Sequence, residues 1–449
     1  MRIVFSIAIC ALFAAAAGFG QQPVNLTLPQ CVDMALSHNT NVIQAENSLE
    51  AAQFGTTAAY GALIPSLSLG GGFSRAQSWS KYVFLDNGAA IPNPNGSAFF
   101  ADNKWNSGLS GSLTLFNGFS NTSNITRANS NSNAAQHSLE RNQQTAIITT
   151  HQKFLTVVST YELLKVSEDN LKRSTEQLQQ IVEKNKVGSV ALADVYRQQV
   201  QVGNDEFSLI QAQNNHEKAK SDLVTFLGVE YNQQYTFDFA GVPSDIDTTE
   251  FSGLNAGYTN YPNLVETALA KRPDYQASVE GVNSAEASVT MARANYFPVV
   301  SANASYGYNS IELDQLTGNR GLTVGLSVSL PLLNGFSTQN VLEQSIAQRQ
   351  NAKEQMMQGA RQLRVDVRNA LLDLETAEKQ VKVSQTTVKS AETDREIAQE
   401  KYNLGSGTLL DLLTATANYT NALTNKVVAV TNYLLAKKQV EYVLGVITH

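Results

Sequence analysis

The chain repeats itself, and this duplication constrains its fold more than any other feature of the sequence. LPQCVDMAL at 28–36 aligns without a gap on YPNLVETAL at 261–269. Farther along, LSGSLTLFNGFSN at 109–121 aligns on LSVSLPLLNGFST at 326–338. Self-similarity over such distances indicates one structural plan that is used twice.

The two alignments differ in their offset by 16 residues, so the first copy contains an insertion. The insertion lies within SWSKYVFLDNGAAIPNPNGSAFFADNKW at 78–105, a segment rich in Pro, Gly and Asn. Because loops accept added residues more readily than packed elements do, we predict a surface loop here.

Each copy contains two segments in which apolar residues alternate with small polar residues. In GLTVGLSVSLPL at 321–332, Leu326 and Val328 share one face, opposite Ser327 and Ser329. Such alternation over about ten residues is typical of the wall of a transmembrane β-barrel, although a strand of a soluble sandwich alternates in the same way. The segments of this kind predict strands at about 65–74, 107–117, 298–309 and 320–333.

After each NGFS phrase the period of the sequence changes. From Ser337 onward, apolar residues recur at steps near three and four or their sums, as at Leu363, Val367 and Leu374, among Gln, Lys and Glu. This spacing predicts an amphipathic helix with a heptad-like seam. A helix from Ser337 to Leu404 would be roughly 100 Å long, at about 1.5 Å per residue. No compact domain needs a helix of that length.

Glycine and proline mark the transitions between these elements. Gly118 and Gly335 supply backbone freedom where a strand bends into a helix, and the serine that follows each NGF can cap the first N–H groups. Pro65 and Pro298 end the incoming helix, because proline lacks a donor and clashes with the preceding turn. Each copy is therefore expected to run helix, Pro, strand, loop, strand, NGFS, long helix, Gly turn, helix.

Four strands are too few to close a barrel. An open sheet edge in hydrocarbon would leave backbone groups unsatisfied, so strands that enter a membrane must be completed by other copies of the chain. Two copies would supply eight strands and a barrel filled by its own side chains, whereas three would supply twelve and could enclose a passage.

The N-terminus has the order of a secretory signal peptide. Arg2 is followed by an apolar run that begins at Ile3 and by small residues up to Gly20, so we predict that residues 1–20 are removed on export. The remaining Cys31 can form no intramolecular disulfide and no multi-thiolate metal site. No later segment has the roughly 18 consecutive apolar residues that a spanning helix requires.

Composition and motifs argue against catalysis and nucleic-acid binding. The formal net charge is -7 and no basic run is present, which disfavours nucleic acid as a partner. The five histidines form no HExxH pair, and the sequence has neither a GxSxG elbow nor a glycine-rich phosphate loop. We therefore expect no enzyme and no cofactor. A secreted or periplasmic structural coiled-coil protein without channel activity stays open as an alternative.

Together, the duplicated plan, the prolines before the strands, the NGFS exits and the turns KVGSVALAD at 186–194 and NLGSGTLLD at 403–411 resemble the TolC family of outer membrane efflux proteins. The resemblance covers about residues 25–446. It implies an α+β membrane protein with two repeats, each with two transmembrane β-strands and long coiled-coil helices, assembled as a trimeric 12-stranded β-barrel with a periplasmic α-helical barrel. The implied boundaries are a first efflux repeat at 21–230, an inter-repeat equatorial segment at 231–260 and a second efflux repeat at 261–449.

The same resemblance implies a function and its partners. The chain would be the passive exit duct of a tripartite efflux or type I secretion system, located in the cell outer membrane with its helical tunnel in the periplasm. Its partners would be a periplasmic adaptor protein, an inner-membrane pump of the RND, ABC or MFS type, and outer membrane lipid.

The resemblance also implies site residues. The adaptor would contact the hairpin tips, although the two glycines can equally be read as helix C-caps. The periplasmic aperture would include Asp411, as an acidic ring or as an ordinary helix N-terminal residue, together with Tyr402 and Asp194, which we expect to be joined by a hydrogen bond for which Arg197 competes. The tip positions are Val187, Gly188, Ser189, Leu404, Gly405 and Ser406.

Two positions depart from the family pattern. Thr414 stands where a second acidic residue is found, and Gly407 stands where some members carry an arginine that locks the closed state. We therefore expect one acidic ring and a weaker closed state.

Overall fold

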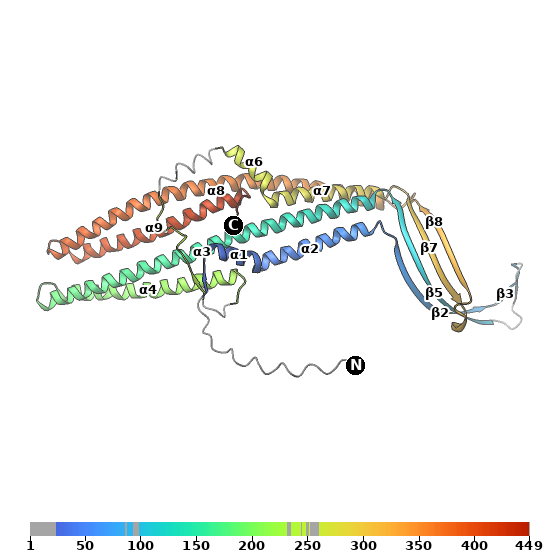
Figure 1. Cartoon of the computed structure of the whole chain (residues 1–449), viewed down its shortest axis with the longest axis horizontal. Helices are drawn as coiled ribbons and strands as arrows, with labels where there is room; N and C mark the ends of the chain where they lie inside the picture. The colour runs from blue at the N-terminus through green and yellow to red at the C-terminus, as the bar shows by residue number, and fades with distance from the viewer. Residues whose placement is uncertain are drawn as a thin grey trace, which may run out of the picture. The chain divides into compact units, whose positions relative to one another are not determined.

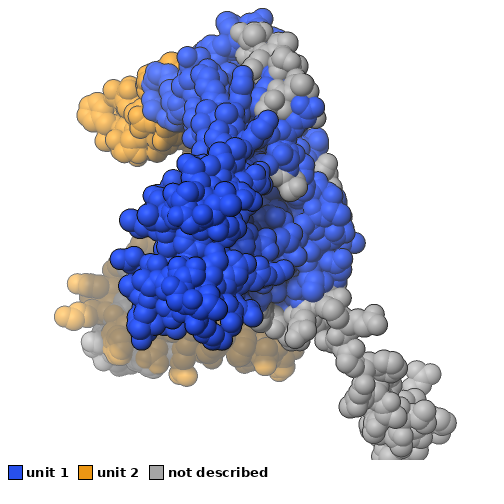
Figure 2. Space-filling model, turned by 90° about the vertical axis from the view of Figure 1, so that its left-hand side faces the viewer, with its two compact units in different colours: residues 1–47, 137–276, 358–449 blue, residues 48–136, 277–357 orange. Residues whose placement is uncertain are grey.

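The computed structural model describes residues 24–85, 88–92, 98–230, 235–243, 245–247, 251 and 260–448. The chain divides into two compact units, coloured separately in Figure 2. Unit 1 comprises residues 1–47, 137–276 and 358–449, and unit 2 comprises residues 48–136 and 277–357. The predicted signal peptide at 1–20 and most of the inter-repeat segment at 231–260 lie outside the described residues.

The α-helices whose bounds lie within the described residues occur as four pairs of equal length, which confirms the duplication (Figure 1). The two helices of each pair begin at positions that the sequence alignments match, as Leu28 with Tyr261 and Ser120 with Ser337. The pairs are α1 (Leu28–His38) with α6 (Tyr261–Lys271), 11 residues each; α2 (Thr40–Gly61) with α7 (Pro273–Ala294), 22 each; α3 (Ser120–Lys186) with α8 (Ser337–Asn403), 67 each; and α4 (Leu192–Phe226) with α9 (Leu409–Val443), 35 each.

The four predicted strands form one antiparallel sheet in unit 2, in the order β2-β5-β7-β8 (Figure 1). Leu69, Leu109, Tyr306 and Leu322 lie opposite one another across it. The first repeat therefore meets the second through the β5–β7 pair. The strands are β2 (Ser66–Ser80), β5 (Ala98–Asn117), β7 (Val299–Ser310) and β8 (Arg320–Ser329).

Parts of the insertion in the first repeat are strand rather than loop. β2 and β5 stay paired from Arg75 opposite Asn103 to Ser80 opposite Ala98, beyond the predicted strand ends. Ladder pairing depends on backbone groups, so it continues where the apolar alternation has stopped. β8 in turn ends at Ser329, because Pro331 has no N–H to donate to a ladder.

The remaining short elements form two small sheets and one turn. β1 (Val24–Leu26) pairs in parallel with β6 (Tyr235–Phe237) in unit 1, and β3 (Tyr82–Phe84) pairs with β4 (Ala90–Pro92) in unit 2. A 3-10 turn, η2 (Leu313–Gln315), lies between β7 and β8. None of the described helices combines the length and apolar composition that crossing a bilayer requires.

The predicted helical seam forms the core of unit 1. Leu363, Val367, Leu374 and Val381 of α8 are almost fully buried and pack with apolar residues of α6 and α9, including Tyr433. A matching core joins α1, α3 and α4 in the first repeat. Burial of such a stripe, rather than local propensity, supplies most of the stability of helices this long.

The last hairpin helix of each repeat ends against the turn between the first two helices of the same repeat. Gly228 and Gly445 both have φ of +71°, and a Cβ at either position would collide with that turn, at His38 O in the first repeat and at Arg272 Cα in the second. Each repeat therefore contains the same close approach of a helix end to a turn, and only glycine permits it.

Candidate functional site

The two hairpin tips have the same backbone geometry. Gly188 and Gly405 adopt φ of +75° and +74°. The N–H groups of Ser189 and Ser406 donate to the carbonyls of Lys184 and Lys401, at 2.8 and 2.9 Å, as in a Schellman helix C-cap. Both glycines therefore end helices, and a role in docking is compatible with that.

The tips present apolar side chains to solvent. Val187 and Leu404 occupy equivalent positions in the two turns and are 80% and 79% exposed. Exposed apolar side chains at the end of a polar helical hairpin are typical of a contact surface for another chain.

Directly behind the tips, residues of both repeats form one small core. Ile181 and Val195 of the first hairpin pack with Tyr402, Leu409 and Leu412 of the second. The two hairpins of a chain are therefore held together near their ends.

The expected hydrogen bond between Tyr402 and Asp194 is not formed. Asp194 instead accepts from Nη1 of Arg197 at 3.2 Å, one turn along α4. The buried Tyr402 hydroxyl has no hydrogen-bond partner among the described residues, while Nζ of Lys184 lies 4.8 Å from the centre of its ring. Burial and the charge of Asp194 raise the pKa of Tyr402, so the hydroxyl stays neutral. Asp194 therefore pairs with Arg197, which lies one turn away on the same helix, and not with Tyr402.

Asp411 is an exposed side chain in the first turn of α9. It forms a capping box with Thr408: its backbone N–H donates to Oγ1 of Thr408 at 3.1 Å, and its carboxylate accepts from the Thr408 hydroxyl and N–H at 2.6 and 3.1 Å. Hydrogen bonds from Thr408 lower the pKa of Asp411. The carboxylate is thus held ionised at the tip of the second hairpin.

The two departures from the family pattern also have structural consequences. The Thr414 hydroxyl donates to the carbonyl of Leu410 at 2.8 Å and adds no charge. A Cβ at Gly407 would lie 2.9 Å from Cβ of Lys401, so a side chain at this position would require the turn to shift.

At the sheet end of each repeat, the NGF turns place two successive residues in the left-handed region. Gly118 and Phe119 have φ of +64° and +69°, and Gly335 and Phe336 have +60° and +65°. The reversal from strand to helix requires this backbone, and glycine accepts it without the Cβ penalty.

The asparagine of each NGFS, rather than the serine, makes the first side-chain contacts of the helix. Oδ1 of Asn117 accepts from the backbone N–H of Asn121 at 3.2 Å, and its Nδ2 donates to Oδ1 of the same residue. Nδ2 of Asn334 donates to the Thr338 hydroxyl in the equivalent turn. Asn117 is the last residue of β5, so its side chain reaches an N–H group of the first helical turn, a contact expected of the serine. Asn334 contacts a side-chain hydroxyl of that turn instead.

Pro65 and Pro298 lie directly before β2 and β7, after the ends of α2 and α7. Pro298 belongs to the corner that meets the NGF turn of the other repeat. A Cβ on Gly118 would lie 2.7 Å from the carbonyl oxygen of Ala294 and 2.8 Å from Cβ of Phe297. Glycine at 118 is therefore required by packing as well as by φ.

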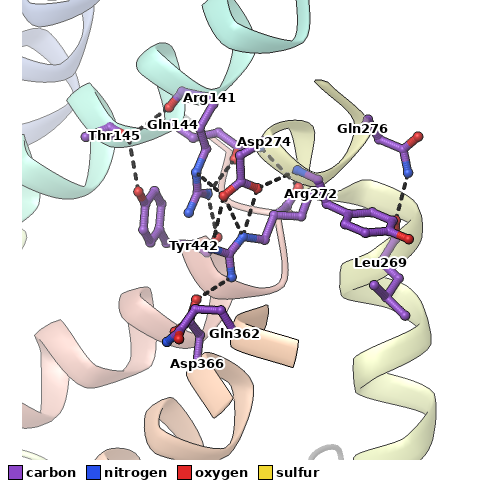
Figure 3. Close-up of polar contacts among 12 residues, drawn as sticks. Arg141, Gln144, Thr145, Leu269, Arg272, Asp274, Gln276, Gln362, Asp366 and Tyr442 are labelled. Carbon is purple, nitrogen blue, oxygen red and sulfur yellow. Dashed lines mark hydrogen bonds and ion pairs between the residues drawn. The ribbon is translucent and has the colours of Figure 1, made fainter. Parts of the chain in front are cut away.

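An ionic cluster in unit 1 was not predicted from the sequence (Figure 3). Arg272, which is mostly buried, donates from Nη1 to Asp366 at 2.8 Å and from Nε to Asp274 at 2.9 Å. Arg141 of α3 lies over the Tyr442 ring, 3.8 Å from its centre, with Nε 3.7 Å from Asp274. The cluster thus joins α3, α7, α8 and α9, which belong to different repeats.

A polar cavity of about 470 Å³ lies between the two hairpins of unit 1 and was also missed. Asp205 and Gln198 are buried in its wall, and each has an oxygen without a hydrogen-bond partner among the described residues. In the second repeat the equivalent positions are Ala422 and Ala415. The described residues contain no group of His, Cys, Asp or Glu arranged to hold a metal ion.

Sequence comparison gives a family and several relatives. A profile of the family described as outer membrane efflux protein matches residues 31–229 and 264–446. Outer membrane protein TolC of Escherichia coli is 22% identical over 318 residues, which cover 68% of this chain and 62% of that protein. The probable efflux pump outer membrane protein TtgC of Pseudomonas putida is 26% identical over 271 residues, which cover 58% of this chain and 52% of that protein. The chain thus spans less than two thirds of the length of these relatives.

Structural comparison gives the same fold. The Campylobacter jejuni CmeC outer membrane channel superposes with a TM-score of 0.76 at 20% identity, covering 96% of this chain and 90% of that one. A membrane protein from Pseudomonas aeruginosa gives a TM-score of 0.78 at 18% identity, covering 94% and 91%. These matches confirm the predicted fold class.

Proposed function

Because the chain belongs to the outer membrane efflux protein family, we propose that it forms a passive outer membrane channel, the exit duct of a tripartite efflux or type I secretion system. The observation that carries this proposal is the sheet of unit 2. One face of this sheet is apolar and open to the surroundings, and six leucine and valine residues on it have exposed fractions between 69% and 82%. These residues are Leu67, Leu69, Leu322, Val324, Leu326 and Val328. A sheet with such a face is suited to lipid.

The opposite face of the same sheet suits a water-filled interior. Ser68 lies opposite Ser110, and Ser301 lies opposite Ser327, with glycines and asparagines between them. The hydroxyls of Ser68 and Ser110 are hydrogen-bonded across the strands at 2.8 Å. A polar inner face and an apolar outer face are the two sides that a porin-like wall requires.

The number of strands requires several copies. Four strands leave two open edges, and three copies would close twelve strands around a passage. We therefore propose a homotrimer whose helices continue the channel as a tunnel in the periplasm.

The hairpin tips are proposed to dock a periplasmic adaptor protein, which in turn connects the channel to an inner-membrane pump. Support comes from the exposed Val187 and Leu404 at matching turns and from the names of relatives such as the probable efflux pump outer membrane protein TtgC. In this arrangement the pump selects the substrate and the duct contributes no catalytic residue.

The aperture is proposed to lie at the second hairpin, where three copies of Asp411 would form one acidic ring. Such a ring would favour the passage of cations. Its closely spaced carboxylates would oppose one another's ionisation, and the hydrogen bonds from Thr408 offset this effect because they lower the pKa of Asp411. Gly407 in place of a locking arginine, and the unformed Tyr402–Asp194 hydrogen bond, support a weakly held closed state, while Thr414 in place of a second acidic residue leaves one ring only.

Planar-bilayer recording of the purified protein tests the function. We expect stepwise conductance with cation selectivity, and a reversal potential that moves toward zero in Asp411→Asn. The exposed Asp222→Asn in α4 is the matched control and leaves selectivity unchanged. A protein that fractionates with the periplasm and never conducts would support the alternative, a structural coiled coil.

A further inference from the structure

The polar cavity between the two hairpins of unit 1 has the features of a site for a small dipolar ion. We propose that it binds an aliphatic zwitterion, a molecule of about amino-acid size with separate ammonium and carboxylate groups. The ammonium would bind Asp205 and Gln198 of α4, and the carboxylate would bind Arg173 of α3 and Arg395 of α8. This inference goes beyond the proposed channel and does not depend on it.

The cavity is enclosed by both repeats. Its volume of about 470 Å³ lies within the range of small-molecule sites. Its walls come from α3 and α4 of the first repeat and from α8 and α9 of the second, and all the lining residues belong to unit 1. A ligand in the cavity would therefore contact both hairpins.

Asp205 is a buried carboxylate whose hydrogen-bond partners are neutral. It is 5% exposed, and its Oδ1 accepts from Nδ2 of Asn170 at 2.8 Å and from Nε2 of Gln201 at 3.0 Å. The hydroxyl of Thr420 on α9 in turn donates to Oδ1 of Asn170 at 3.1 Å. Oδ2 of Asp205 has no hydrogen-bond partner in the described part of the chain. Burial of such a charge is costly unless a cationic donor reaches it.

Gln198, two turns before Asp205 on the same helix, offers a second acceptor. It is 1% exposed, and its Nε2 donates to the carbonyl oxygen of Ser174 at 2.9 Å. Because a carbonyl only accepts hydrogen bonds, this contact fixes the orientation of the amide. Oε1 is then an acceptor without a partner among the residues that the structure describes. The helix α4 thus contributes two buried acceptor groups to the cavity wall.

Two arginines from different repeats line the same cavity. Cζ of Arg173 lies 5.9 Å from the centre of the Tyr419 ring, and Cζ of Arg395 lies 5.2 Å from it, so one aromatic residue of α9 positions both. Neither arginine pairs with a carboxylate of a described residue, and Nε of each is a buried donor without a partner there. Two guanidinium groups held near one ring are suited to bind a carboxylate.

Opposite charges therefore line one cavity without pairing with each other. A simple cation would compensate Asp205 but leave the arginine donors unpaired, and a simple anion would do the reverse. Water supplies donors and acceptors but no charge, so it leaves the buried carboxylate uncompensated. A molecule that carries both charges satisfies both sets of groups, and charge-assisted hydrogen bonds are the stronger kind in an enclosed site.

The second repeat shows that helix packing does not require these polar residues. Its α9 has Ala415 and Ala422 at the positions equivalent to Gln198 and Asp205. Both alanines are buried, with exposed fractions of 4% and 3%. The same structural plan is thus built with small apolar residues at these positions. In the first repeat a buried amide and a buried carboxylate replace them, and a bound ligand offsets the cost.

Isothermal titration calorimetry of the purified, dialysed protein in detergent tests the site. The titrants are glycine, β-alanine, γ-aminobutyrate and ε-aminocaproate, whose two charges lie progressively farther apart. Methylamine and acetate, which carry one charge each, are compared at the same concentrations. Glycine betaine keeps both charges but lacks the N–H donors that Asp205 and Gln198 require. We expect saturable heat for at least one of the four amino acids, and none for methylamine, acetate or glycine betaine.

Single substitutions assign the two ends of the ligand. Asp205→Asn and Arg395→Gln should each weaken binding by about tenfold or more, because each removes a charge-assisted contact. Asp222→Asn and Arg361→Gln are the matched controls, since they change exposed residues of the same two helices. Both controls should bind as the unmodified protein does.

The double variant Gln198→Ala with Asp205→Ala reproduces the residues of the second repeat, so it should fold and lose binding. Circular dichroism and thermal unfolding without titrant verify the fold of each variant. Binding that survives in both Asp205→Asn and Arg395→Gln, or equal binding of methylamine or acetate, overturns the proposal. An absence of saturable heat with every zwitterion also overturns it and means that the cavity holds water only. None of these results bears on bilayer conductance, which tests the channel separately.

Discussion

The Asp411 carboxylate accepts hydrogen bonds from both the hydroxyl and the backbone N–H of Thr408, at 2.6 and 3.1 Å. The alternative reading of Asp411, an ordinary residue at a helix N-terminus, therefore describes the single chain correctly. A role in an aperture is added only when copies assemble. The two readings are compatible, because the cap fixes the carboxylate in its ionised form at the tip of the second hairpin.

Thr408→Val should raise the pKa of Asp411, because the hydroxyl that donates to its carboxylate is lost. Asp411 has a lowered pKa in the folded chain, so its stabilising contribution is present above the ordinary Asp value of about 3.9 and is lost as the pH falls through the lowered value. The measurement is the reversal potential in a salt gradient as a function of pH, whose midpoint should move to higher pH. Thr414→Val, which removes a hydroxyl bonded only to a backbone carbonyl, is the control. An unchanged midpoint in Thr408→Val would show that this hydroxyl does not tune the carboxylate.

Tyr402→Phe should leave the stability of the protein unchanged or slightly higher. The hydroxyl is buried without a partner among the described residues, so its removal relieves a desolvation cost and breaks no hydrogen bond. Tyr402→Ala should instead cost about 3–4 kcal/mol, because the ring packs with Ile181 and Leu412. Urea unfolding of both variants distinguishes the two effects. A clear loss of stability in Tyr402→Phe would indicate a hydrogen bond made to another copy.

Arg272→Met should destabilise the protein by roughly 3 kcal/mol or more, because it leaves Asp366 and Asp274 without their buried partner. Lys379→Met is the matched control: its partner Glu375 is an exposed residue one turn away, and such surface pairs contribute little to stability. Chemical unfolding of the two variants under the same conditions provides the comparison. Equal losses would mean that the ionic cluster does not hold the repeats together.

His151 should make the protein sensitive to mild acid. Burial, with a smaller effect of Lys438, lowers its pKa to about 4. Because the folded pKa lies below the ordinary value of about 6.5, the contribution to stability is complete above pH 6.5 and is lost as the pH falls toward 4. The loss is on the order of 2–3 kcal/mol.

The difference between the unfolding midpoints at pH 7.5 and pH 4.5 should therefore be smaller in His151→Gln than in the unmodified protein. The exposed His38→Gln is the control and should keep the full pH dependence. If His151→Gln loses as much stability on acidification as the unmodified protein, another group is responsible.

The elements of this fold were predictable because period and repeats are local properties of the sequence. The seam through Leu363 and Val367 and the glycine turns at Gly188 and Gly405 were each visible in a short window. Because the chain is duplicated, each of these features appears in both repeats, and the whole set of features is specific to one family although each alone is weak.

The features that were missed depend on contacts between distant residues. Arg272 meets Asp366 across 94 positions of sequence, and nothing near either residue marks the pair. Asp205 and Gln198 look like ordinary polar helix residues until α3 and α8 enclose them. The Tyr402–Asp194 hydrogen bond was expected by analogy and failed, because Arg197 lies one turn from Asp194 and holds it.

The central claim is that one chain cannot close its own sheet and that three copies share one barrel. Native mass spectrometry of the detergent-solubilised outer membrane protein tests this claim most directly. The account predicts a single species with three copies of the chain, which separates into monomers only when the strands unfold. A folded, monodisperse monomer with the β2-β5-β7-β8 sheet intact would contradict it.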